Sequence, residues 1–145
     1  MRSKVIYDGP QRTYALVMDT GDEAVATLER FAAEHRLTAT QLTGLGAFQE
    51  AVVGYYDWIK KDYRRIPVKE QVEVISLVGD IVLADGKPKL HAHVVLGRED
   101  GSTRGGHLLE ARVRPTLEVI LTESPAHLKR ETDAETGLPL IRIEK

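Results

Sequence analysis

Alternating apolar and polar residues along most of the chain predict a fold built mainly from strands. Residues 12–19 show the period-two pattern of a half-buried strand. The same pattern predicts strands within 37–48, 51–58, 71–83, 89–121 and 140–143, with Pro115 expected to interrupt the segment 89–121. From Val74 onward the segment 71–83 is apolar on both faces, which predicts a strand buried on both sides.

Residues 23–35 instead show the period of a helix. Their apolar side chains recur at intervals of three and four, with charged side chains largely opposite, as in an amphipathic helix packed on a sheet. Asp22 precedes this segment and is the expected N-cap. Strands dominate, so the predicted fold class is α+β: a mostly antiparallel sheet of about seven strands with one main amphipathic helix packed on it. No linker or repeat divides residues 1–145, which predicts a single domain.

Three of the five histidines fall within one segment of the sequence. His91 and His93 are two residues apart in an alternating run, so their side chains share a face. His107 follows after a turn that contains Asp100 and Gly101. A three-residue loop over 99–101, with Gly101 in the left-handed conformation, would place His107 directly opposite His93. A two-residue Asp100-Gly101 turn would place His107 on the other face.

Three imidazoles on one face predict a site for a divalent metal ion, most readily zinc, because a three-histidine set with an open fourth position is typical of zinc sites that accept a ligand. The alternative interpretation is that these histidines pack on the sheet or in a contact between subunits. Glu110 is a further candidate, as an additional ligand or as the partner that orients an imidazole. Gly105 and Gly106 predict a bulge, which would change the register, or a close backbone crossing that presents N–H groups to a ligand.

Net charge and composition narrow the functional classes. The 145 residues carry a formal net charge of −2 and no cysteine, which gives no global basic footprint for nucleic acid and excludes disulfides and thiolate ligands. No apolar run reaches membrane-spanning length and no leader is apparent, so a soluble cytoplasmic protein is expected. The segment 59–66 is locally basic. It predicts either a solvated hairpin turn or a nucleic-acid contact through Lys60, Lys61, Arg64 and Arg65.

Several other residues have weaker functional interpretations. Gly44 and Gly46 predict a bulge or a close backbone approach, since their spacing matches no phosphate-binding loop. His35 and His127 are expected to be exposed to solvent. Two arginines that could bind an anion, and two serines that have no evident base partner, are expected to be ordinary surface residues: Arg12, Arg104, Ser76 and Ser102.

An ordered set of segments resembles a known family. These segments are GDEAV at 21–25 before the helix, LTGLGA at 42–47, VEVISLVG at 72–79, HAH at 91–93 and GGHL at 105–108. Together they resemble the PPC domain, the plant and prokaryote conserved domain that follows AT-hooks in plant nuclear DNA-binding proteins. The resemblance implies a compact α+β domain that assembles as a homotrimer through its sheet. The AT-hook is absent from this chain, so the resemblance implies only weak binding of DNA.

Two hypotheses of function follow. The first is a stand-alone PPC-type binding module, DNA-associated or regulatory, that forms a homotrimer and holds a metal ion. The alternative is a metal-dependent enzyme or small-molecule-binding protein that uses His91, His93 and His107; the sequence does not decide whether the protein is an enzyme. Self-association is also favoured by apolar strand residues that one helix cannot cover, namely Val74, Ile75, Leu77, Val78, Ile81 and Leu83.

Overall fold

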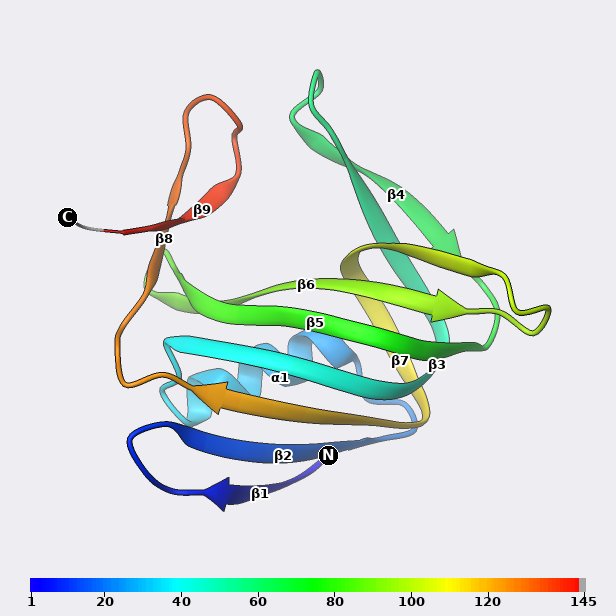
Figure 1. Cartoon of the computed structure of the whole chain (residues 1–145). Coiled ribbons are helices and arrows are strands. Elements are labelled where there is room, and N and C mark those ends of the chain that lie inside the picture. The colour runs from blue at the N-terminus through cyan, green and yellow to red at the C-terminus, as the bar shows by residue number, and fades with distance from the viewer. Residues whose placement is uncertain (144–145) are drawn as a thin grey trace.

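The computed structural model describes residues 1–143. Over this range, nine strands join into one sheet, and a helix packs against one of its faces (Figure 1). The elements are β1 (Arg2–Tyr7), β2 (Arg12–Asp19), α1 (Ala24–Glu34), β3 (Ala39–Asp57), β4 (Asp62–Val68), β5 (Val72–Ala84), β6 (Lys87–Gly97), β7 (Thr103–Glu123), β8 (Lys129–Thr132) and β9 (Pro139–Arg142). No helix within residues 1–143 is long and apolar enough to cross a membrane.

The sheet is organised around two long strands, β3 and β7, which pair with each other along most of their length. The main path runs β1-β2-β7-β3-β5-β8-β9, with β4 on β3 and β6 between β5 and β7. All pairings are antiparallel except the short one between β5 and β8. In Figure 1 the β3–β4 hairpin and the β8–β9 hairpin both stand above β5 and β6. The predicted α+β class and antiparallel character are therefore confirmed.

The helix and the sheet enclose an apolar core. Tyr14, Leu16 and Met18 point inward from β2, as their alternation predicts, and each is at most 2% exposed. The helix buries Leu28 and Phe31 against this face, and the Phe31 ring meets the Tyr14 ring edge-on at 5.3 Å between centroids. Burial of side chains of this size contributes about 1.5–3 kcal/mol each, which is the main force holding the helix on the sheet.

The helix begins one residue later than expected and uses a different cap. Glu23, not Asp22, is the N-cap: its Oε2 accepts the N–H of Ala26 at 2.7 Å. Its other carboxylate oxygen accepts the N–H of Ala111 on β7 at 2.9 Å, so one side chain caps the helix and fixes it to the sheet. Asp22 instead accepts the N–H of Asp19 at 3.0 Å and closes the preceding turn.

The strand count of about seven was wrong, because the sheet has nine strands. All six residues of β1 are exposed, so this edge strand carries no apolar alternation in the sequence. Strands β4 and β8 were also not counted, because β4 begins within the basic segment interpreted as a hairpin turn and the four residues of β8 are all polar. In the opposite direction, β3 unites the two strands predicted within 37–58.

Strand β7 continues through Pro115, which was expected to interrupt it. The β3–β7 register shifts between the pairs Gly46–Leu117 and Phe48–Val113, so Pro115 lies at an irregular step of that ladder. A proline lacks a backbone N–H and is tolerated where regular pairing is broken. Gly46 permits a close crossing at the same place, because a Cβ there would lie 2.2 Å from the carbonyl oxygen of Thr116. The predicted close backbone approach at this glycine is confirmed.

One face of β5 is exposed at Ile75 and Val78, which corrects the prediction of burial on both sides there, whereas the consecutive residues Ile81 and Val82 are both buried. Leu77 is 1% exposed, whereas Ile75 and Val78 are 52% and 50% exposed, because the helix covers the opposite face. These two residues belong to a set that we call the outer apolar face: Leu45, Ile75, Val78, Val95 and Ile120. One ladder row crosses this face, joining Ile120, Thr43, Val78 and His93 across four strands.

Candidate metal centre

The hairpin between β6 and β7 has the register predicted for a three-residue loop. The N–H of Arg98 donates to the carbonyl oxygen of Ser102 at 2.9 Å, and Gly101 has φ +79°, in the left-handed region. Counting back along the ladder, His93 lies directly opposite His107. The pairing is regular through the two glycines that precede His107, so the bulge that could have changed the register does not occur.

The three histidines converge on one side of the sheet, as this register requires. Each of His91, His93 and His107 offers a ring nitrogen within 4.8 Å of the nitrogens offered by the other two. Their ring centroids are 5.2, 5.2 and 5.6 Å apart. Two nitrogens bound to one tetrahedral zinc ion lie about 3.3 Å apart, given Zn–N bonds of about 2 Å. Small rotations about the side-chain bonds of the three histidines would bring their nitrogens from within 4.8 Å to that spacing.

Gly106 allows the backbone of β7 to approach β3 closely beside this cluster. A Cβ at Gly106 would lie 2.6 Å from the carbonyl oxygen of Gly54, a distance that would force the strands apart. Gly105 faces the β6 backbone, where a Cβ would lie 3.0 Å from the carbonyl oxygen of Val94. Of the two interpretations of this glycine pair, the close crossing is confirmed.

Burial keeps two of the imidazoles neutral. His107 stacks on the ring of Tyr63 at 4.5 Å, and the Tyr63 hydroxyl lies 3.4 Å from His107 Nδ1. Burial, followed by repulsion from the other two imidazoles, lowers the pKa of His107 from 6.5 to about 4. Burial is also the main cause that lowers the pKa of His91, with the positive charge of Arg130 second. A neutral imidazole has a free lone pair, which is the form that binds a metal.

Arg130 and Asp80 flank His91, and sequence reasoning missed both of them. Arg130 Nη2 donates to Asp80 Oδ1 at 2.5 Å and lies 3.3 Å from His91 Nδ1. A guanidinium can only donate, so His91 Nδ1 is the acceptor and the neutral ring carries its proton on Nε2. Asp80 also faces His91 directly in the β5–β6 ladder. No local motif joins Arg130 to the histidines, because β8 reaches them only through its short parallel pairing with β5.

A cavity of about 300 Å³ opens beside the cluster where β6 and β7 separate. The β6–β7 pairing runs as far as His93 and His107, after which His91 stays on the β5 ladder and His107 lies opposite Gly54 of β3. The C-terminal hairpin and the start of the helix close the space. Its lining residues outside the histidines are Val25, Tyr63, Lys89, Leu90, Leu108, Leu109, Arg130, Leu138, Pro139 and Leu140.

Glu110 lies outside the cluster, although it was expected as a further ligand or as an orienting partner. Its carboxylate pairs with Arg65 across the β3–β4 side of the sheet and is exposed. The structure brings Arg130, Asp80 and Tyr63 to the imidazoles in its place. His35 and His127 are exposed, as predicted.

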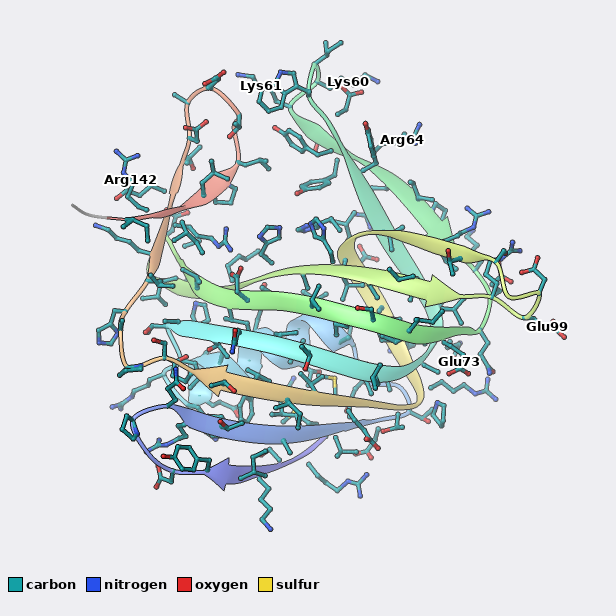
Figure 2. The ribbon with its side chains drawn as sticks, in the orientation of Figure 1. Lys60, Lys61, Arg64, Glu73, Glu99 and Arg142 are labelled. Carbon is teal, nitrogen blue, oxygen red and sulfur yellow. The ribbon has the colours of Figure 1, made fainter. Side chains whose placement is uncertain are left out.

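The basic cluster lies on the hairpin between β3 and β4, with Lys60 and Lys61 in the turn and Arg64 and Arg65 on β4, and a hairpin turn was expected there. Figure 2 shows Lys60, Lys61 and Arg64 there, away from the body of the sheet. Arg64 lies over the ring of Tyr55, with its guanidinium carbon 5.6 Å from the ring centroid. The side chain of Arg65 is half exposed and pairs with a carboxylate, as described above.

Comparisons with known proteins bear on both the fold and the site. A family model described as the Plants and Prokaryotes Conserved (PCC) domain matches residues 6–125. The chain is similar to a plant- and prokaryote-conserved (PPC) protein from Pyrococcus horikoshii, at 35% identity over 92% of this chain and 93% of that one, with a TM-score of 0.86. It is similar to a metal-containing protein from Archaeoglobus fulgidus, also at 35% identity, with coverages of 96% and 95% and a TM-score of 0.83.

A third similar structure is described as a "putative DNA-binding protein" from Ralstonia eutropha JMP134. It is 29% identical to this chain, with coverages of 90% and 91% and a TM-score of 0.85. Among curated proteins, none matches the chain.

Proposed function

We propose that this chain, which belongs to the Plants and Prokaryotes Conserved (PCC) domain family, is a binding module that holds a divalent metal ion between His91, His93 and His107. The observation that carries this proposal is the convergence of three ring nitrogens within 4.8 Å. The similar protein from Archaeoglobus fulgidus, which is described as metal-containing, supports it independently.

Zinc is the ion that we propose, on the chemistry of the donors. Zinc binds readily to neutral imidazoles, and three of them leave a fourth position open for water or another ligand. Calcium and magnesium prefer oxygen donors, and the cluster supplies none. Burial holds the pKa of His91 and of His107 below the ordinary value, so both rings are neutral at pH 7 and need release no proton to bind an ion.

We assign Asp80 the role of orienting His91 when the ion is bound. A metal-bound imidazole normally donates its remaining N–H to an acceptor. Arg130 cannot accept, whereas the carboxylate of Asp80 faces His91 across the ladder and already lies within reach of the same guanidinium. Ion binding would therefore shift a hydrogen bond of His91 from Arg130 to Asp80.

Elemental analysis of the purified protein tests the metal site. After dialysis, we expect about one zinc ion per chain in the natural sequence and little or none after His93→Ala. His127→Ala is the matched control, because His127 is exposed and lies outside the cluster. Absence of stoichiometric metal in the natural sequence, or equal retention by the His93 and His127 variants, would contradict the proposal.

The partner that we propose is the chain itself, in a homotrimer. The outer apolar face leaves side chains that are 40–63% exposed on four strands of the sheet, and contiguous exposed apolar surface usually marks an interface. The trimeric assembly implied by the resemblance to the PPC domain fits this face. His93 lies in the same ladder row as Val78, so the interface would border the metal centre.

A second candidate function is weak association with DNA. It is favoured by the basic hairpin and by the similar Ralstonia protein, which is described as a "putative DNA-binding protein". Lysine and arginine neutralise phosphates, and an exposed aromatic ring such as that of Tyr55 offers a stacking surface. The net charge of −2 opposes strong binding, so we expect an interaction that weakens steeply with salt and has little sequence preference.

Fluorescence anisotropy with a labelled duplex tests the DNA proposal at two salt concentrations. Replacing the four basic hairpin residues with alanine should abolish the binding: Lys60, Lys61, Arg64 and Arg65. The control variant removes the same charge from four exposed positions elsewhere in the protein and should retain most of the DNA binding: Lys4, Arg30, Lys87 and Arg114. Equal loss in both variants would remove the hairpin from the proposal, and salt-tolerant, sequence-selective binding would contradict it.

A further inference from the structure

The cavity beside the histidines has no acidic residue in its lining, as far as residues 1–143 are concerned. Its charged lining residues are Lys89 and Arg130, and each pairs with an acid that lies outside the lining: Glu29 at 3.0 Å and Asp80 at 2.5 Å. An ion held by three neutral imidazoles keeps its full double positive charge, because no ligand in the cluster is anionic. The occupied site would therefore attract an anion into the open position.

The remaining walls of the cavity are apolar. They come from the helix, from the middle of β7 and from the C-terminal hairpin: Val25, Leu108, Leu109, Leu138, Pro139 and Leu140. Small-molecule sites combine such walls with a few polar groups that fix the orientation of the ligand. At about 300 Å³, the cavity is at the small end of the usual range.

Arg130 is the buried charged group in the wall of this cavity. Its side chain is only 5% exposed. Nη1 donates to the carbonyl oxygen of Pro139 at 2.9 Å, and Nη2 donates to Asp80, but Nε has no partner among the described residues. Both outer nitrogens are therefore held by the protein, which fixes the guanidinium beside His91.

We propose that this cavity binds a small carboxylic acid that carries an apolar chain. The carboxylate takes the open position on the metal ion, and the chain packs against the leucines of β7 and of the C-terminal hairpin. The inference rests on the metal site proposed above, and it adds the chemical class of the ligand. An amine would be repelled by the ion, and a short acid such as acetate would leave the apolar walls in contact with water.

The test uses the full chain loaded with cobalt, whose absorption spectrum reports ligands entering the open position. Hexanoate is titrated against acetate, which lacks the chain, and hexanamide, which has the chain but no charge. Burial of about two methylene groups gives about a tenfold gain in affinity. We expect hexanoate to bind at least tenfold more tightly than acetate, and hexanamide to bind more weakly than either acid.

Two apolar positions near the end of the chain provide a pair of variants. Leu140 lines the cavity and is 42% exposed, whereas Ile143 is 72% exposed and lies outside the lining. Leu140→Asp places a negative charge in the cavity wall and should weaken hexanoate binding at least tenfold. Ile143→Asp adds the same charge outside the cavity and should leave the affinity for hexanoate nearly unchanged. Both positions are partly exposed, so both variants are expected to fold.

The outcomes separate the ligand from the metal site. Preferential binding of hexanoate that is lost only in Leu140→Asp supports the inference. Cobalt binding with equal affinity for hexanoate and acetate overturns it and leaves the metal site standing, as does equal weakening by the two variants. Failure to bind cobalt or zinc overturns the proposed metal site, and the inference falls with it.

Discussion

Lowering the pH from 7.5 to 5 should destabilise the metal-free protein through His107. The pKa of this ring is about 4 in the folded protein and about 6.5 in the unfolded chain. Between these values the unfolded chain binds a proton that the folded protein does not, so stability rises with pH in this window. The contribution of neutral His107 to the free energy of unfolding is present in full above pH 6.5 and is lost as the pH falls towards 4.

The size of the effect follows from the two pKa values. A fully expressed shift gives a loss of about 2 kcal/mol between pH 7.5 and pH 5. His107 is partly exposed, and water screens part of its interaction with the surrounding groups, so we expect about 1 kcal/mol. Carboxylates contribute little over this interval, because the shifted ones have pKa values lowered from 3.8.

Urea denaturation at fixed protein concentration, in the presence of a chelator, measures this loss. The comparison is with His107→Asn, which cannot take up a proton near these pH values. The natural sequence should lose about 1 kcal/mol more than the variant between pH 7.5 and pH 5. The lowered pKa of His91 acts in the same direction in both proteins and largely cancels. An equal loss in the two proteins, or a larger loss in the variant, would refute the reasoning.

Three further perturbations test the sheet and its outer face. Gly79→Ala would place a Cβ 2.4 Å from a β6 carbonyl oxygen, so urea denaturation should show a loss of about 1–3 kcal/mol; a loss below about 0.5 kcal/mol would contradict this close approach. Glu123→Ala removes a carboxylate that accepts two backbone N–H groups and two threonine hydroxyls, and should cost about 2 kcal/mol, against less than about 0.5 kcal/mol for the exposed Glu99→Ala. Equal costs for these two would contradict the role of the carboxylate. Val78→Asp should lower the mass in light scattering to that of a monomer, while Ile6→Asp at a similarly exposed site should not; a monomeric natural sequence would refute the trimer.

The histidine register could be predicted from the sequence because local chemistry determines it. An Asp-Gly pair in a short loop favours a left-handed glycine, and the parity of the strand numbering then places His107 opposite His93. The amphipathic helix could be predicted for the same reason, since the period of its apolar residues is a local property of the sequence. Its cap was not, because Glu23 was selected over Asp22 by a contact with β7.

What the sequence could not reveal depends on distant pairing. Arg130 reaches His91 across 39 residues, and no pattern in either segment refers to the other. β1 escaped prediction because an exposed edge strand has no buried face to produce alternation. The outer face of β5 was predicted to be buried because the sequence pattern around an apolar residue such as Ile75 is the same whether or not a helix covers that residue.

The C-terminal hairpin, β8 and β9, lines the cavity, whereas the histidines lie on β6 and β7. It supplies Arg130 and the wall around Leu140, yet it joins the sheet through only two pairs of residues on β5. The nitrogen donors are set elsewhere, by the β6–β7 loop, and the family match ends at residue 125, before this hairpin begins. Substitutions at Leu138, Pro139 or Leu140 would thus reshape the cavity wall while the three histidines keep their places, whereas a substitution of Arg130 would also reach His91 and Asp80. The choice of ligand can therefore diverge among relatives through the wall of this hairpin, apart from the strands that carry the histidines.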